Sequence, residues 1–593
     1  MRAALLACVC LVGTAGIWNA PAWITPAWAA SAPAVEAEHG MVVSAQRLAS
    51  EAGIEMLKAG GNAIDAAVAV GYAEAVTNPC CGNIGGGGFL VAHLADGRDI
   101  FIDFRETAPA AATAGMYLDA AGAVIPGASE RGWRSVGVPG TVMGLDTALA
   151  EYGTMTRAQV MAPAIRMAQD GFILDRGSTD ILEAGARKFH ADAELGRIFL
   201  RPDGTPFRPG NRLTQPDLAA TLSAIAAQGP AAFYQGRIPA AVEAASRAGG
   251  GILTAADFAA YRVGEQPPIT CIYRGYVFAS APPPSSGGVT LCEILNILEG
   301  YDLHAMGFHS AQSVHIITEA MRHAYLDRNT FLGDPGFVEN PLGRLLSPEY
   351  AAAIRATINA DTATPSATLG PGTAPHEKPE TTHYSVLDQA GNAVAVTYTI
   401  NGLFGAGVMA PGTGFLLNDE MDDFTVKPGT ANMFGLVQGA ANAIAPGKRP
   451  LSSMSPTLVS KDGRIVMVLG SPGGSRIITI TLEVALNMID YGMAPQEAVD
   501  APRFHHQWLP DTLFAEPFAL SPDTARLLSG MGYHLAEQTP WGAAELIVVG
   551  PPRSATPGPA SSGNDTTHTS PMRPGLIYGA NDNRRPAGAA IGY

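Results

Sequence analysis

Apolar residues along the first part of the chain recur at helical spacing. Residues 44–58 mix apolar and polar positions in this way, and Ala59-Gly60-Gly61 follows, as glycine commonly does at the end of a helix. Asn62 then precedes a second segment, reaching Val76, that is almost wholly apolar. A helix that is apolar on every side is predicted to be deeply buried. The clearest further helices are predicted at residues 159–170, 215–228 and 311–331.

The spacing of apolar residues changes to a period of two immediately after a linker-like stretch. Residues 361–380 are rich in Thr, Pro, Gly and Ala and show no apolar period, which predicts an exposed linker. Residues 381–387 and 393–400 then alternate around a turn and predict a β-hairpin. The same reasoning predicts strands at 89–93 and 99–104, a hairpin at 457–469, a helix at about 477–489, and a polar loop insertion at 551–574.

The composition is that of a compact, well-buried protein. The 593 residues are more than one hydrophobic core usually organises, so two to four core-sized units are expected. Hydrophobic residues make up 47% and charged residues 15% of the chain. The net charge of −16 argues against a general nucleic-acid or anionic-membrane binder, because those partners need a positive surface.

The first thirty residues have the order of a secretory signal peptide. Arg2 is followed by an uncharged, mostly apolar run at residues 3–17, and small residues follow around Trp28. The run is short for a membrane span. We therefore expect export to the periplasm or out of the cell, with cleavage after Ala29 or Ala30; an uncleaved anchor is the alternative.

Four of the six cysteines remain after such a cleavage: Cys80, Cys81, Cys271 and Cys292. No C-x-x-C pair with metal spacing is present, so a zinc site is not expected. An oxidising compartment permits a disulfide between Cys271 and Cys292, with buried free thiols as the alternative. The sequence leaves the state of all four open.

The junction between the linker and the hairpin, Glu380-Thr381, is the most informative point of the chain. An isolated Thr at a strand edge is usually an ordinary polar residue. Cleavage before Thr381, however, would free an α-amino group beside its hydroxyl. Such an amine has a pKa of about 7.7–8.0 and can act as base for its own side chain near neutral pH. Local chemistry alone makes Thr381 a plausible nucleophile.

Several segments in a fixed order strengthen this interpretation. They are residues 85–88 (GGGG), 103–106 (DFRE), 282–288 (PPPSSGG), 333–335 (GDP), 381–386 (TTHYSV), 391–401 (GNAVAVTYTIN), 417–424 (LNDEMDDF), 448–456 (KRPLSSMSP), 470–477 (GSPGGSRI) and 501–508 (APRFHHQW). From about residue 38 to the C-terminus, excepting 551–574, the chain resembles the γ-glutamyltransferase (γ-glutamyltranspeptidase, glutathione hydrolase) family of N-terminal-nucleophile hydrolases.

The resemblance implies an α+β fold, the four-layer αββα sandwich, formed jointly by two chains after self-cleavage. Cleavage between Glu380 and Thr381 would give a large subunit, residues 31–380, and a small catalytic subunit, residues 381–593. The two would form a heterodimer from one precursor. No cofactor or metal is implied, because the free amine supplies acid–base chemistry.

The resemblance also assigns a role to each matched residue. Thr381 is the nucleophile and Thr399 supports it. Gly473 and Gly474 present backbone N–H groups to the oxyanion. The glutamyl group is bound by the remaining matched residues: the α-carboxylate by Arg105, Ser452 and Ser453, the α-ammonium by Glu420 and Asp423, and the substrate more generally by Asn401.

One position departs from many bacterial relatives. Phe434 stands in the loop expected to close over the substrate, where those relatives place a tyrosine. A phenyl ring can cover the pocket but cannot donate a hydroxyl hydrogen bond towards Asn401. We therefore predict a lid that is present but held less firmly, and expect Phe434→Tyr to change turnover or acceptor preference.

Other motif interpretations fail on spacing. The glycines at 85–88 lack the dinucleotide-binding pattern, and the segment around Lys448 lacks that of a phosphate loop. The adjacent His505 and His506 are poor joint metal ligands, because neighbouring side chains point in different directions. No nucleophile elbow of the type found in α/β-hydrolases stands out.

The function expected from these observations is transfer or hydrolysis of γ-glutamyl groups. Thr381 would attack a γ-glutamyl amide such as glutathione, and water or an amino acid or short peptide would then accept the glutamyl group. A cephalosporin or glutaryl acylase on the same scaffold is the alternative, and retention of Asp423 favours glutamyl over glutaryl substrates. A hypothesis of another class is an exported binding protein that is never cleaved.

Overall fold

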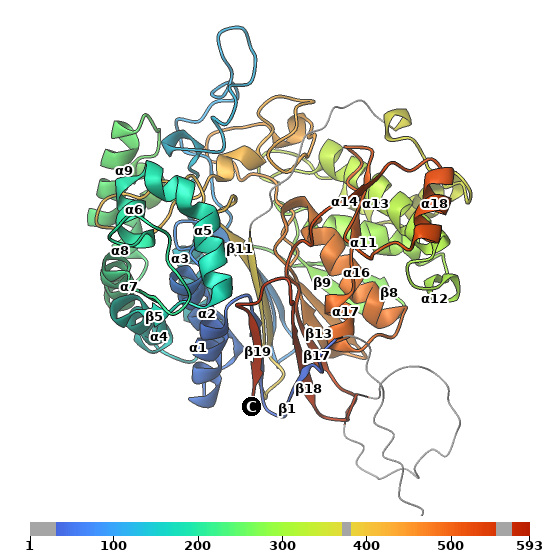
Figure 1. Ribbon diagram of the computed structural model, residues 1–593, viewed down its shortest axis with the longest axis horizontal. Helices are drawn as coiled ribbons and strands as arrows, with labels where there is room; N and C mark the ends of the chain where they lie inside the picture. Colours follow the sequence, from blue (N-terminus) through green and yellow to red (C-terminus); the bar gives the residue numbers. More distant parts are fainter. Residues whose placement is uncertain (1–30, 370–380, 553–571) are drawn as a thin grey trace, which may run out of the picture.

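Two stacked β-sheets form the centre of the computed structural model, which describes residues 31–369, 381–552 and 572–593 (Figure 1). The first sheet has, in order, β1 (Val35–Ala37), β18 (Ile577–Asn581), β17 (Glu545–Val549), β13 (Arg464–Leu469), β12 (Thr457–Lys461), β9 (Tyr276–Ser280) and β8 (Ile269–Tyr273). The second has β19 (Ala589–Gly592), β2 (Met41–Ser44), β10 (Thr382–Leu387), β11 (Ala393–Thr399), β3 (Gly87–His93), β4 (Asp99–Asp103) and β7 (Gly264–Glu265).

Both sheets combine strands from before and after residue 381. In the second sheet, β10 and β11 lie between β2 and β3, which come from the first hundred residues. Every strand pair described in the two sheets is antiparallel. A dry layer between the sheets contains Phe89, Leu458 and Ile547, among other buried apolar residues. The two sequence halves therefore share one folded unit.

Helices cover the outer face of each sheet (Figure 1). Those on the second sheet's side are α1 (Arg47–Lys58), α2 (Ala63–Thr77), α3 (Thr141–Tyr152), α4 (Arg157–Asp170), α5 (Arg176–Ala191), α6 (Ala193–Phe199), α7 (Pro216–Gln228), α8 (Ala231–Tyr234), α9 (Arg237–Ala248) and α10 (Ala255–Ala260). Those on the first sheet's side are α11 (Gly287–Leu298), α12 (Leu303–Met306), α13 (Ala311–Phe331), α14 (Leu342–Leu345), α15 (Pro348–Thr357), α16 (Ile477–Ile489), α17 (Pro495–Asp500) and α18 (Pro522–Gly530). The predicted four-layer αββα sandwich is confirmed.

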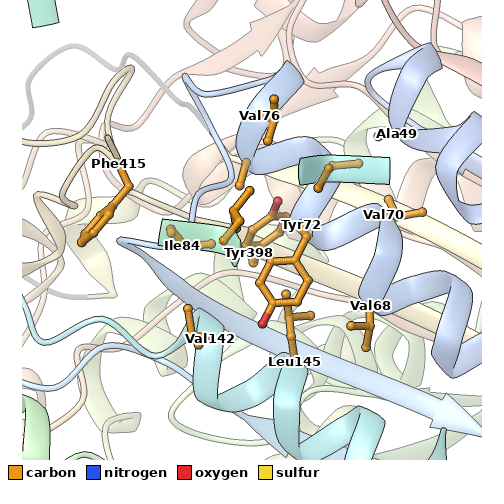
Figure 2. Close-up of a cluster of buried hydrophobic side chains, with 14 of the residues drawn as sticks. Ala49, Val68, Val70, Tyr72, Val76, Ile84, Val142, Leu145, Tyr398 and Phe415 are labelled. Atoms are coloured by element: carbon orange, nitrogen blue, oxygen red, sulfur yellow. The ribbon is translucent and has the colours of Figure 1, made fainter. Parts of the chain in front are cut away.

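The apolar helix predicted after Asn62 is α2, and every one of its residues is buried. Asn62 accepts a hydrogen bond from the backbone of Asp65, whose carboxylate accepts one from the Asn62 backbone, so both ends of a capping box are present. Figure 2 shows Tyr72 and Val76 of α2 among apolar side chains that include Leu145 of α3 and Tyr398 of β11. The prediction of deep burial is confirmed.

The start of the first helix differs from the prediction. Ser44 belongs to β2, and α1 begins only at Arg47 because the Gln46 side chain accepts a hydrogen bond from the Leu48 backbone N–H and caps the helix. The hairpin predicted from residue 381 forms as β10 and β11, closed by a hydrogen bond from the Asp388 N–H to the Asn392 carbonyl. The helix predicted at 311–331 is α13.

The cysteines left open by the sequence are paired. Cys271 of β8 is bonded to Cys292 of α11, and Cys80 is bonded to its neighbour Cys81. The predicted signal peptide at residues 1–30, Glu380 and most of the predicted insertion at 551–574 lie outside the described residues. Within the described ranges, no helix is both long and apolar enough to cross a membrane.

Candidate active site

Thr381 lies where the central hairpin of the second sheet begins. Because Thr382 pairs with Tyr398, the next residues outward, Thr381 and Thr399, lie opposite each other. The Thr399 hydroxyl donates to the Thr381 hydroxyl at 3.4 Å and accepts a hydrogen bond from the Asn401 backbone N–H at 2.8 Å. Asn401 itself has a φ of 72°, which turns the chain out of the strand. The hairpin thus orients three of the residues singled out from the sequence.

A small polar cavity of about 20 Å³ opens beside Thr381, and we call it the glutamyl pocket. It is lined by Arg105, Arg328, Thr381, Thr399, Asn401, Glu420, Asp423, Phe434, Leu436, Ser452, Ser453, Met454, Gly474, Ser475 and Ile477. Every predicted catalytic and substrate-binding residue is on this wall except Gly473, the neighbour of Gly474. The residues on this wall come from segments up to 372 positions apart in the chain, from Arg105 to Ile477.

The acidic end of the pocket is a 3-10 turn, Glu420–Asp423. Arg105 follows the end of β4 and is buried. Its guanidinium donates hydrogen bonds to the carboxylates of both Glu420 and Asp423. Its Nη1 also lies 3.6 Å from Oε2 of Glu106. Burial raises the pKa of Glu420 well above its ordinary value and that of Glu106 to about 8. The arginine predicted to bind the substrate carboxylate therefore contacts the acids predicted to receive the ammonium.

The opposite end of the pocket is rich in hydroxyl groups. Ser452 and Ser453 follow the buried Leu451, and the Ser452 carbonyl accepts hydrogen bonds from both the N–H and the hydroxyl of Ser286. The Ser453 hydroxyl accepts a hydrogen bond of 2.9 Å from Nη2 of Arg328. The segment at 282–288, quoted above for its sequence, therefore supports the two serines from behind.

Two glycines lie just before α16, where Gly473 precedes the short 3-10 turn Gly474–Arg476 that leads into this helix. Gly473 has a φ of 146° and Gly474 a φ of 57°, conformations that residues with a side chain rarely adopt. A Cβ on Gly473 would also lie 2.9 Å from Cδ1 of Ile480. The N–H groups of the first helical turn have no partners within the helix, so this turn can face developing negative charge at Thr381.

The sequence of the chain matches the family model described as gamma-glutamyltranspeptidase over residues 49–589. The chain belongs to the γ-glutamyltranspeptidase family.

Two relatives and one solved structure show how similar this chain is to other proteins. The glutathione hydrolase proenzyme of Pseudomonas sp. (strain A14) is 57% identical over 565 residues, which cover 95% of this chain and 96% of that protein. The glutathione hydrolase proenzyme of Escherichia coli (strain K12) is 46% identical over 560 residues, 94% and 93% of the two chains. The crystal structure of cephalosporin acylase from Bacillus halodurans has a TM-score of 0.80 at 26% identity and covers 98% of this chain and 99% of that one.

The pocket of this family member contains a residue that the sequence did not single out, Arg328. It lies in the last turn of α13, five positions before the matched segment at 333–335. A signal was present, because the helix predicted at 311–331 carries this arginine close to a matched motif. Its position within the helix, however, did not reveal which cavity the side chain faces.

The loop expected to cover the pocket is closed over it. Phe434 is buried, and its carbonyl accepts a hydrogen bond of 3.1 Å from the Gln507 side chain. The preceding Met433 N–H donates to Asp422 at 2.9 Å, and Nδ2 of Asn401 lies 3.5 Å from the Met433 sulfur. Backbone contacts therefore hold this loop. Whether the missing tyrosine hydroxyl loosens the lid stays a prediction.

A second, wider cavity of about 310 Å³ lies on the other side of Thr381, and we call it the outer cavity. It is lined by Ala45, Asn78, Gly177, Asp180, Ile181, Ala184, Thr381, Leu403, Pro472, Arg584, Arg585, Pro586 and Ala587. Among the described residues, Thr381 is the only one that lines both the glutamyl pocket and the outer cavity.

Proposed function

We propose that this protein is a γ-glutamyltransferase with glutathione hydrolase activity, and that Thr381 is its nucleophile. The observation that carries the proposal is the position of Thr381, which lies at the start of the central hairpin and on the walls of both cavities. The pocket on one side offers guanidinium, carboxyl and hydroxyl groups, which suit a headgroup that carries both an ammonium and a carboxylate.

The same hydroxyl would first cleave the chain before Thr381. Attack of the Thr381 hydroxyl on the carbonyl of Glu380 breaks the peptide bond and forms an ester, which water hydrolyses to a Glu380 carboxylate and a free Thr381 amine. The Thr399 hydroxyl, 3.4 Å away, supports the attacking oxygen. Because both sheets combine strands from the two parts, the large and small chains would stay together as a heterodimer.

Turnover would follow in two halves. The freed amine takes the proton of the Thr381 hydroxyl as its oxygen attacks the γ-carbonyl, and the N–H groups of Gly473 and Gly474 stabilise the oxyanion. The amine returns the proton to the leaving nitrogen, which leaves a γ-glutamyl ester on Thr381. Water then gives glutamate, or an amino acid or dipeptide amine takes the group.

The glutamyl headgroup would lie in the glutamyl pocket, bound by the residues that the sequence assigned to it: Arg105, Asn401, Glu420, Asp423, Ser452 and Ser453. The amine half of the substrate would occupy the outer cavity, since Thr381 lies between the two. The N-terminal pattern at residues 1–30 supports export of the precursor.

Hydrolysis of a glutaryl side chain is the second candidate, supported by the similarity to a cephalosporin acylase structure. Asp423, predicted to receive the ammonium, already has a cationic partner, because Arg105 contacts it. Two carboxyl groups nevertheless share that single guanidinium, so the acidic end can accommodate a further cation. This arrangement favours the glutamyl group.

The proposal is tested by the mass of the purified protein and by its products from glutathione. We expect two chains, the smaller beginning at Thr381, and release of glutamate and cysteinylglycine. Thr381→Ala should give one uncleaved chain and no products. A wild-type protein that stays in one chain and hydrolyses nothing would support the uncleaved binding protein instead.

A further inference from the structure

Arg328 is a buried cation that faces the glutamyl pocket. The residue is 1% exposed, and its guanidinium lies beside Ser452 and Ser453 on the pocket wall. It reaches this place from α13, the helix that packs against α11 on the outer side of the first sheet. The other guanidinium of the pocket, that of Arg105, approaches from the opposite sheet.

The two arginines differ in their partners. Arg105 contacts the carboxylates of Glu420 and Asp423. Arg328 donates to neutral oxygens instead: Ser286 Oγ at 2.9 Å, Asn329 Oδ1 at 2.8 Å, Ser453 Oγ at 2.9 Å and Gln438 Oε1 at 3.5 Å. Among the ion pairs of the described residues, none includes Arg328. Its hydrogen bonds fix the orientation of the guanidinium without neutralising its charge.

A charge in this position favours an anion in the pocket. Taking a guanidinium out of water is unfavourable unless an opposite charge comes close. Burial lowers the pKa of Arg328 to about 10, with the nearby Arg105 acting in the same direction and Tyr325 and Asp423 opposing it. The group still carries its charge at neutral pH. The pocket therefore has a positive end at Arg328 and the two serines, and an acidic end at Glu420 and Asp423.

We propose that Arg328 is a specificity-determining residue, which supplies the positive charge that the α-carboxylate of the glutamyl group requires, directly and through the hydroxyl of Ser453. Arg105 then has a second task, to hold Glu420 and Asp423 in place for the α-ammonium. The inference rests on the proposed function, because it concerns the same reaction at Thr381.

Two chromogenic substrates separate this role from a structural one. γ-Glutamyl-p-nitroanilide carries the α-carboxylate, and 4-aminobutanoyl-p-nitroanilide lacks it but keeps the ammonium group. The readout is the ratio of kcat/KM for the two substrates, which does not depend on how much of a preparation is folded and cleaved. Wild type, Arg328→Gln and Arg328→Lys are compared.

Hydrogen bonds to charged groups are worth enough to change binding roughly 10- to 100-fold, so Arg328→Gln should lower the ratio by about that factor. Arg328→Lys keeps the charge without the planar fork and should lower the ratio less. Arg322→Gln is the matched control. Arg322 is equally buried on α13 but is paired with Glu319 and Asp511 and is not on the pocket wall, so its loss should leave the ratio unchanged.

An unchanged ratio in Arg328→Gln overturns the inference. If that variant yields no cleaved enzyme, Arg328→Lys is measured together with Ser286→Ala, which removes the acceptor of the Arg328 Nε–H. Each should lower the ratio roughly 2- to 10-fold, and an unchanged ratio in both also overturns it. Failure of the proposed function looks different, because wild type itself would then cleave neither substrate.

Discussion

The two cavities that meet at Thr381 differ in size and in what lines them. The glutamyl pocket measures about 20 Å³ and is enclosed by four charged side chains, those of Arg105, Arg328, Glu420 and Asp423. The outer cavity measures about 310 Å³, and apolar side chains and prolines make up much of its wall.

Charged groups in the outer cavity are less enclosed. Asp180 is exposed, and Arg584 is paired with Glu516 and Asp582 behind the cavity wall. Because buried, oriented charges discriminate between ligands far more strongly than exposed ones, the enzyme should select the glutamyl half strictly and the amine half loosely. The two cavities beside the Thr381 hydroxyl are therefore expected to differ in how strictly they select what binds in them.

The largest effect is expected from the residue that the two cavities share. Thr381→Ala should lower hydrolysis of glutathione by roughly 10⁴-fold or more and prevent chain cleavage, because both reactions need its hydroxyl. Thr381→Ser, which keeps a hydroxyl, should retain both in part. Gel electrophoresis and glutamate release measure them, and a cleaved Thr381→Ala chain would show that another residue is the cleavage nucleophile.

The next largest effect should fall on the glutamyl pocket. Asp423→Asn leaves Arg105 with one carboxylate partner fewer and removes charge that would face the ammonium. We expect the preference for γ-glutamyl- over glutaryl-p-nitroanilide, measured as a ratio of kcat/KM, to fall about 100-fold. A preference that survives this change would mean that the acidic end does not recognise the ammonium.

A third effect concerns protein stability and the buried carboxyl of Glu106, which lies beside Arg105. Burial raises the pKa of Glu106 from 4.5 to about 8, so the folded protein binds this proton more tightly than the unfolded chain. Relative to Glu106→Gln, wild type should lose stability as the pH rises from about 4.5 to 8, by at most about 1.4 kcal/mol per pH unit, and the difference should level off outside that window. Thermal unfolding of the two proteins across this range measures it; a constant difference in Tm would contradict it.

The smallest effect should come from the outer cavity. Leu403 is half-buried on its wall, and Leu403→Ala removes contact area without removing a charge or a buried hydrogen-bonding group. We expect kcat/KM to change by less than roughly threefold for glutathione and for γ-glutamyl-p-nitroanilide, with similar factors for both leaving groups. A loss confined to one leaving group would show that this side also selects.

Local patterns explain which parts of the structure could be predicted. The hairpin at Thr381 and the buried helix α2 follow from apolar spacing and one cap, so both were predictable. The start of α1 was not, because it depends on the side chain of Gln46. Likewise, the pairing of Cys271 with Cys292 depends on the approach of β8 to α11, which no local pattern encodes.

The glutamyl pocket, too, could be predicted from the sequence only in part. Motifs named Arg105, Glu420 and Asp423, but they did not show that Arg105 contacts both acids, since it lies more than 300 residues before them in the chain. Arg328 was missed because its relevance depends on Ser453, which is brought to it from another segment by tertiary packing. Sequence motifs therefore identify most residues of the site, but only the folded structure shows which of these residues contact one another.

The strict selection of the glutamyl half is tested most directly on wild type with three p-nitroanilides: γ-glutamyl, glutaryl and 4-aminobutanoyl. The two ends of the pocket predict that γ-glutamyl-p-nitroanilide is cleaved with the highest kcat/KM, and that loss of either the ammonium or the carboxylate lowers it at least about tenfold. Equal or faster cleavage of the glutaryl compound would contradict this and place the protein with the acylases.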